Sequence, residues 1–114
     1  MENIIKEKSF RFSVRIVKLC KFLRETKKET VMTKQLLRCG TSIGANIAES
    51  QQAQSRPDFI SKLNIALKES SETEYWLQLL YETNYLTKPQ FSSIITDCYE
   101  LKRLLISIVK TAKK

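Results

Sequence analysis

The chain has 114 residues, of which 42% are hydrophobic and 28% charged, with only two glycines and two prolines. A chain of this length can bury one core as a single domain over residues 1–114, and so few breakers argue against an all-β fold. The formal net charge of +8 favours a polyanionic partner such as nucleic acid, an anionic membrane face or an acidic protein, unless it serves solubility alone.

The residue types that the sequence lacks exclude several kinds of site. There is no histidine, which removes the commonest general base and metal ligand. Cys20, Cys39 and Cys98 lack the spacing of a zinc site, so we expect reduced core thiols. No phosphate-binding glycine loop or hydrolase motif occurs. We therefore predict a protein that is not an enzyme and that uses no metal or cofactor.

The apolar segments of the sequence are short. No window approaches the roughly 20 apolar residues of a membrane-spanning helix. The first residues also lack the apolar stretch of a secretory signal. We therefore expect a cytoplasmic protein that does not associate with a membrane.

The first predicted helix covers residues 4–27 and carries two apolar stripes at helical spacing. The stripe expected to face the core consists of Phe12, Ile16, Leu19 and Leu23. The second stripe consists of Phe10, Val14 and Val17. Two apolar faces need two partners, so we expect the second stripe to meet either a neighbouring subunit or another helix of the same chain.

The first helix is also the most basic part of the chain. Residues 1–29 contain nine lysines and arginines against four acids. A basic strip within about a quarter of the helix circumference could follow phosphate groups. This strip consists of Lys8, Arg11, Arg15 and Lys18. Alternatively, basic strips pair with acids of the third helix, which are Glu69, Glu72, Glu74 and Glu82.

The second predicted helix, residues 31–53, combines a row of small residues with a polar stripe. Gly40, Gly44 and Ala48 recur every four residues and predict the close approach of another helix, since glycine otherwise costs about 1 kcal/mol in a helix. The polar stripe consists of Gln35, Arg38, Ser42, Asn46 and Glu49. We expect this stripe either to form a register-fixing network at a helix interface or to dock a partner.

The third and fourth predicted helices, residues 56–82 and 88–112, begin with similar capping patterns. Ser55 and Thr87 are suitable N-caps, and each is followed by a proline in the first turn. The expected core positions of the third helix are Phe59, Leu63, Ala66, Leu77 and Leu80. Those of the fourth helix are Phe91, Ile94, Cys98, Leu101, Leu105, Ile108 and Ala112. Short links between the helices predict an all-α, antiparallel up-down four-helix bundle.

Aromatic residues gather late in the third predicted helix, and they are Tyr75, Trp76, Tyr81 and Tyr85. Aromatic side chains beside basic residues can stack on unpaired bases. More often such a cluster forms part of a core or interface, with its polar atoms at the edge.

Residues 35–50 resemble a known family signature. They read QLLRCGTSIGANIAES, which is similar to the QLxRAxxSIxxNIAEG motif of a four-helix-bundle family first noted in intervening sequences of bacterial 23S rRNA genes. Residues 59–66, 72–77 and 84–86 are similar to further segments of the family, so that the resemblance covers about residues 8–110. Ser50 stands where the family has glycine.

The resemblance implies an assembly and a class of partner. It implies a bundle that assembles into a barrel-like homopentamer. It also implies kinship with the accessory variability protein of diversity-generating retroelements, which binds a reverse transcriptase and, through a basic surface, nucleic acid. By position, Arg38, Ser42, Asn46 and Glu49 match the signature polar residues. We therefore expect a basic oligomeric accessory protein that binds structured RNA or a protein partner, or else a scaffold whose stripes serve self-assembly alone.

Overall fold

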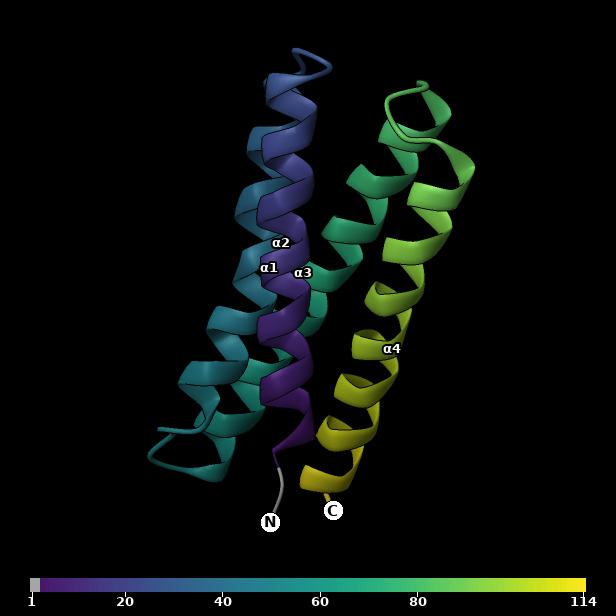
Figure 1. The fold of residues 1–114 in the computed structure, drawn as a ribbon. Helices are drawn as coiled ribbons and strands as arrows, with labels where there is room; N and C mark the ends of the chain where they lie inside the picture. Colours follow the sequence, from purple (N-terminus) through teal and green to yellow (C-terminus); the bar gives the residue numbers. More distant parts are fainter. Residues whose placement is uncertain (1–2) are drawn as a thin grey trace.

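The computed structural model describes residues 3–114 and contains four α-helices, without a strand in that range. The helices are α1 (Ile4–Glu25), α2 (Val31–Ser50), α3 (Arg56–Glu82) and α4 (Lys88–Ala112). They run alternately up and down in a bundle 44 Å long and about 20 Å across, with both termini at the same end (Figure 1). The all-α prediction and the number of helices are confirmed.

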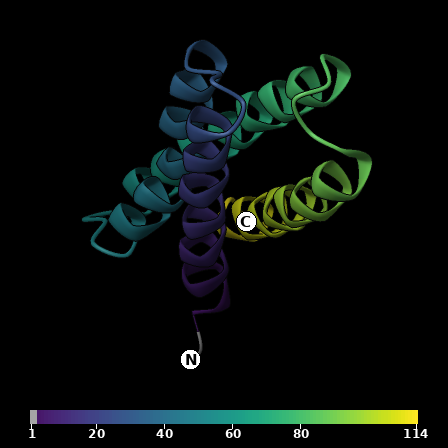
Figure 2. The same ribbon diagram turned by 45° about the horizontal axis from the view of Figure 1, so that its top comes forward.

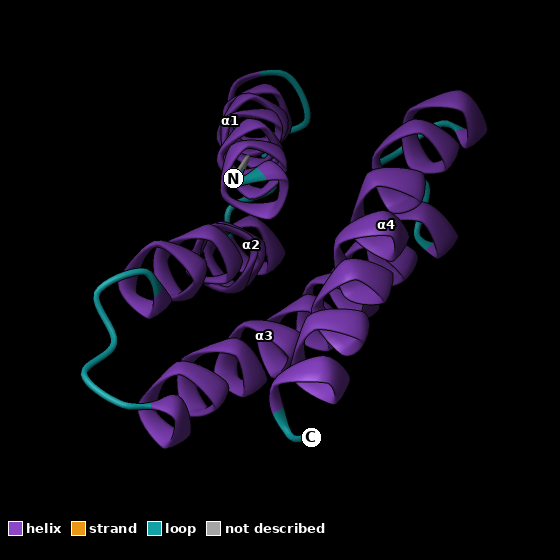
Figure 3. Ribbon diagram, turned by 90° about the horizontal axis from the view of Figure 1, so that it is seen from below, coloured by secondary structure: helices purple, strands orange, loops and turns teal. Residues whose placement is uncertain are grey.

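Neighbouring helices in the sequence are neighbours in space. α2 lies between α1 and α3, and α4 packs along α3, as the view along the bundle shows (Figure 3). α1 and α4 close the bundle through the smallest of its four interfaces. The α1–α2 and α3–α4 turns lie at the end opposite the termini (Figure 1) and are separated from each other there (Figure 2). This end is important for the distribution of charge described below.

The helix starts follow the sequence patterns. Ser55 caps α3 by accepting a hydrogen bond from the backbone N–H of Asp58. Thr87 and Gln90 form the expected reciprocal capping box at the start of α4. α3 ends at Glu82, and Asn84 just beyond it has a left-handed φ of 70°, with backbone bonds from Asn84 N–H to Tyr81 O and from Tyr85 N–H to Leu80 O. This is a Schellman motif, and asparagine is one of the few residues that tolerate its left-handed position.

Two helices end earlier than predicted. α1 was expected to reach residue 27 but ends at Glu25, after which Lys28 turns the chain with a φ of 59°. α2 was expected to reach residue 53 but ends at Ser50. The N–H groups of the next three residues bond to carbonyls three residues back, so the last turn tightens instead of continuing the α-helix.

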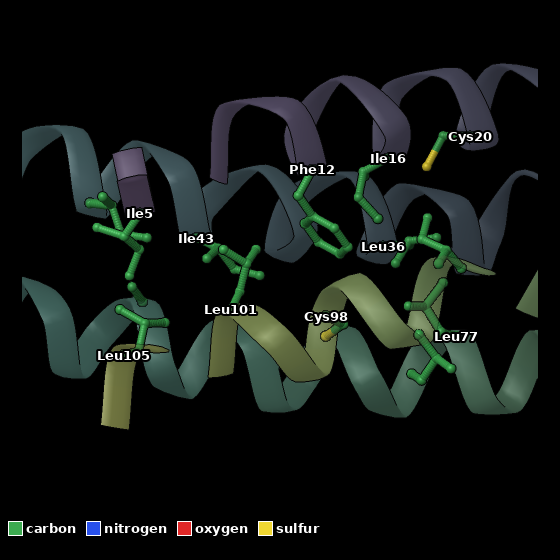
Figure 4. Close-up of a cluster of buried hydrophobic side chains, with 14 of the residues drawn as sticks. Ile5, Phe12, Ile16, Cys20, Leu36, Ile43, Leu77, Cys98, Leu101 and Leu105 are labelled. Atoms are coloured by element: carbon green, nitrogen blue, oxygen red, sulfur yellow. The ribbon is translucent and has the colours of Figure 1, made fainter. Parts of the chain in front are cut away.

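The core runs the length of the bundle and draws on all four helices (Figure 4). Phe12 and Ile16 of α1 meet Leu36 and Ile43 of α2, and all four side chains are buried. The predicted core of α3 was incomplete, because the buried seam continues between Ala66 and Leu77. Two small polar residues fill that gap, Ser70 and Thr73. Their hydroxyls donate to carbonyls of their own helix, which removes the cost of burying them.

The remaining core predictions hold with small shifts. Phe59, Phe91 and Ile108 are only partly buried, as is Leu19 on α1. Ile95 and Val109 are buried on α4 although they were not predicted, because the helix contacts neighbours on two sides.

Candidate nucleic-acid interface and helix contacts

The polar stripe of α2 lies against α3 of the same chain. The Arg38 guanidinium pairs with Glu72 and, at 3.5 Å, with Glu69, and it also donates to the side-chain oxygen of Gln35. Trp76 Nε1 donates to the same Glu72 carboxylate at 3.1 Å. Glu72 is thus held by two donors on two helices. The Trp76 indole is therefore held by a hydrogen bond within the bundle. Tyr75 packs edge-on against Trp76 and is largely exposed.

The rest of the stripe makes simpler contacts. Ser42 Oγ donates to the carbonyl of Arg38 at 2.7 Å, and Asn46 Nδ2 donates to the carbonyl of Ser42 at 2.9 Å. Glu49 pairs with Lys62 of α3 at 3.0 Å, and this bond raises the pKa of Lys62. Arg38 and Glu49 of the stripe therefore have partners on α3, so there the network lies within the bundle.

The small residues of α2 face α1, as predicted for Gly40 and Gly44. A Cβ on Gly40 would lie 2.8 Å from Ile16 Cγ2. A Cβ on Gly44 would lie 2.8 Å from Ser13 Oγ and 3.2 Å from the backbone oxygen of Ser9. Both glycines are thus needed for the close approach of α1. Ala48 continues this row but is exposed, where α1 and α2 diverge.

An apolar groove of about 550 Å³ opens beside Ala48, between the first half of α1 and the second half of α2. Phe10, Gly44, Ala45 and Ala48 contribute to its walls, with Lys6 and Glu7 at its edge. Phe10 is 69% exposed, and the other members of its stripe, Val14 and Val17, are 38% and 49% exposed. The second apolar stripe of α1 is therefore not covered by another helix among residues 3–114.

Most of the predicted basic strip is paired with acids. Lys8 pairs with Glu100 at 3.2 Å, and Arg11 pairs with Glu7 at 3.1 Å. Arg15 pairs with Asp97 at 2.7 Å and donates to the carbonyl and the hydroxyl of Ser93. The acids come from α4 and from α1 itself, not from α3 as the alternative prediction had it. Lys18, the fourth member, is exposed and has no ion pair within residues 3–114.

The acids of α3 pair with other cations. Glu69 and Glu72 hold Arg38 of α2, and Glu74 holds Lys102 of α4 at 3.1 Å. Glu82 makes no such contact within the described part of the chain. The interpretation of these acids as partners for neighbouring helices is therefore correct for three of the four.

A group of exposed cations around the α1–α2 turn includes Lys18 of the predicted strip and extends beyond it. We call it the basic tip, and it consists of Lys18, Lys21, Arg24, Lys27, Lys28 and Lys34. None of the six forms an ion pair with a residue that the structure describes. The sequence signal was present, since six of the 17 residues from 18 to 34 are basic, but a search for one helical strip did not cross the turn.

The tip contains one buried acid, which does not neutralise these cations. The Glu29 side chain accepts hydrogen bonds from the backbone N–H groups of Val31, Met32 and Thr33 at 2.8–3.1 Å. It thereby caps the start of α2 from the position before Thr30. Burial raises the pKa of Glu29, but the three N–H donors lower it more, so the carboxylate stays ionised.

The three cysteines are all free and buried. Burial raises the pKa of Cys20 and Cys39 to about 11 and that of Cys98 to about 12. A thiol with such a pKa is a poor nucleophile and metal ligand at neutral pH. Residues 3–114 contain no cluster of three potential metal-ligating side chains. No helix in that range is long and apolar enough to cross a membrane.

Comparisons with known proteins agree with the fold and with the resemblance of residues 35–50. Residues 1–107 match the family described as 23S rRNA-intervening sequence protein. A crystal structure of a protein with unknown function from the S23 ribosomal protein family of Bacteroides thetaiotaomicron is 63% identical, with a TM-score of 0.94, over 95% of this chain and 96% of that one. No curated protein matches the chain. On the match over residues 1–107, the chain belongs to the 23S rRNA-intervening sequence protein family.

Proposed function

We propose that this chain is a non-enzymatic, basic accessory protein of the cytoplasm that binds structured RNA through its surface cations. The observation that carries the proposal is how the charges are used. Seven carboxylates take part in ion pairs and Glu29 caps a helix, so the acids are largely committed inside the bundle. Only six of the 20 lysines and arginines take part in those pairs.

An excess of unpaired cations favours a polyanion, because each phosphate contact releases counterions. The family resemblance gives a second support, since the accessory variability protein, to which it implies kinship, binds nucleic acid through a basic surface. The proposal does not require any reactive group, which fits buried thiols and carboxylates held in ion pairs.

The test is filter binding of the purified protein to a folded RNA at several salt concentrations. We expect saturable binding whose affinity falls steeply between about 50 and 200 mM salt. The control is an uncharged solute added at the same mass concentration as the salt, and it should leave the affinity unchanged. Failure to bind, or binding that salt does not weaken, would contradict the proposal.

A second property, self-assembly, is supported by the exposed stripe Phe10, Val14 and Val17 and by the groove beside it. Contiguous exposed apolar surface is typical of an interface between proteins. We propose a homo-oligomer with this face at its seam, and the family resemblance suggests a pentameric ring. In the alternative function, a scaffold for protein interaction only, this assembly is the whole role of the protein.

Light scattering tests the assembly. The wild-type protein should show a mass of several copies, and Phe10→Ser with Val14→Ser should reduce it. Ile106→Ser on α4 is a matched control, since Ile106 is 48% exposed but lies on another helix. A monomeric wild type, or an equal response to both variants, would exclude the α1 face as the seam.

A protein partner such as a reverse transcriptase is proposed from the resemblance alone. Co-expression with a reverse transcriptase encoded beside the gene, followed by purification of the complex, tests it. Recovery of both proteins at fixed stoichiometry is the expected result, and separation of the two on gel filtration would contradict it.

A further inference from the structure

The basic tip lies at one end of the bundle, where its cations are exposed to solvent. The end of α1 and the start of α2 form the upper end of the molecule in Figure 1, away from both termini. Five ion pairs hold helices together on the α1 and α2 sides, through Lys8, Arg15, Arg38 and Glu49, and none of the six tip cations takes part in them. The tip is thus exposed and uncommitted to the fold.

Helix stability does not explain all of these cations. Arg24 lies in the last turn of α1, where a cation favours the negative end of the helix dipole. Lys34, however, is the fourth residue of α2, close to its positive end, where a cation is unfavourable. Lys18 and Lys21 lie before the last turn of α1 and gain little from the dipole. The charge at the tip is therefore greater than the fold needs.

The chemistry of the tip indicates which feature of a nucleic acid it can contact. Phe22, the one aromatic residue among residues 18–34, is partly buried against the core. Residues 18–34 therefore offer no stacking platform for unpaired bases, and Tyr81 and Tyr85 near the α3–α4 turn are partly buried against the core. Lysine and arginine side chains on a narrow helical end fit a phosphate backbone instead, and a duplex presents phosphates at the higher density.

We infer that the basic tip is the surface that contacts the phosphate backbone of base-paired nucleic acid, and that the strip Lys8, Arg11 and Arg15 is not. This inference rests on the proposed binding of structured RNA and places it on one end of the bundle. It predicts recognition of backbone shape without preference for base sequence.

Two variants with equal changes in charge test the inference. The tip variant carries Lys21→Glu, Lys27→Glu and Lys34→Glu. The control carries Lys110→Glu, Lys113→Glu and Lys114→Glu, which are exposed cations at the opposite end without ion pairs among the described residues. Far-UV circular dichroism and thermal melting should show that both variants fold.

The readout is affinity for an RNA duplex of about 16 base pairs as a function of salt. We expect the tip variant to bind at least about tenfold more weakly, with a salt slope smaller by about 0.9 for each phosphate that the variant no longer neutralises. The control should bind no more than about threefold more weakly, through long-range charge alone. Equal weakening by both variants, or a tip variant that binds like wild type, would overturn the inference.

Two further arms separate the inference from the proposed function. An unstructured single strand of the same length should bind more weakly than the duplex, and tighter binding would overturn the preference for a paired backbone. Vesicles containing anionic lipid should bind less than the duplex, and stronger binding would identify a membrane as the partner instead. If the wild type binds no nucleic acid at all, the proposed function itself fails.

Discussion

The two ends of the basic helix α1 use the same residue types in different ways. Between its start and its middle, Lys8 and Arg15 form ion pairs with acids of α4 and connect the two helices of the smallest interface. Near its end, Lys18, Lys21 and Arg24 are exposed to solvent without such partners among residues 3–114. The difference arises because α4 presents Asp97 and Glu100 to the first part of α1 but presents no acid farther along.

This comparison shows that positive charge in a sequence has two separate uses. A cation opposite an acid contributes to the position of a helix, although a half-exposed pair contributes little to stability. A cation without an acid remains available to an external anion. Net charge alone does not distinguish the two cases, and the contacts of each side chain are needed.

The largest effect expected concerns the packing that sets the position of α1. Gly40→Val should lower the free energy of unfolding by about 2–3 kcal/mol, because its side chain would collide with Ile16. Lys34→Val, at an exposed position on the same helix and outside the groove, is the control and should cost much less. Urea unfolding followed by circular dichroism measures both. If Gly40→Val does not lower the free energy of unfolding, α1 is not firmly packed against α2 at Ile16. The contrast between the two ends of α1 then loses its basis.

A smaller effect concerns Glu29, the buried acid of the basic tip. Glu29→Gln should cost about 1 kcal/mol at neutral pH, because the amide offers a weaker acceptor to the N–H groups at the start of α2. Since the folded state lowers the pKa of Glu29, its contribution is complete above the unfolded value near 4.5 and disappears as the pH falls through the folded value. The difference between variant and wild type should therefore shrink in acid.

The same variant also tests the electrostatics of the tip. Removal of one negative charge beside the exposed lysines should leave RNA affinity equal or slightly higher. Thermal melts from pH 7 to pH 3 and duplex binding at pH 7 provide the two measurements. A constant stability difference across that pH range would show that the carboxylate charge is not what caps α2.

Much of the fold can be predicted from local sequence patterns without knowledge of the tertiary structure. Ser55, Thr87 and the apolar seam of α4 predicted helix starts and a buried face, and the structure has both. The ends of α1 and α2 were less predictable, since they depend on a left-handed residue at Lys28 and on tightened hydrogen bonds after Ser50. Ser70 and Thr73 were missed because a hydroxyl can be buried once its own helix supplies an acceptor.

The candidate site was predicted only in part, for a similar reason. The spacing of Lys8, Arg11 and Arg15 correctly places them on one helical surface, but the partners of Lys8 and Arg15 lie on α4, about 80 residues away in sequence for Arg15. Gly40 and Gly44 were correctly assigned to close packing, since that use depends only on a missing side chain. Charge pairing between distant segments depends on the register of two helices, which a single sequence does not specify.

The smallest expected effects distinguish Arg15 from Lys18, which are both members of the predicted strip. Arg15→Gln removes bonds to Asp97 and Ser93 and should lower stability by no more than about 1 kcal/mol, as the pair is more than a third exposed, with duplex affinity unchanged. Lys18→Gln should leave the melting temperature unchanged and weaken duplex binding by about threefold, with a smaller salt slope. Urea unfolding and salt-dependent binding, measured on both proteins, provide the two comparisons. The reverse pattern, in which Arg15→Gln weakens binding and Lys18→Gln does not, would return the phosphate contact to the α1–α4 flank.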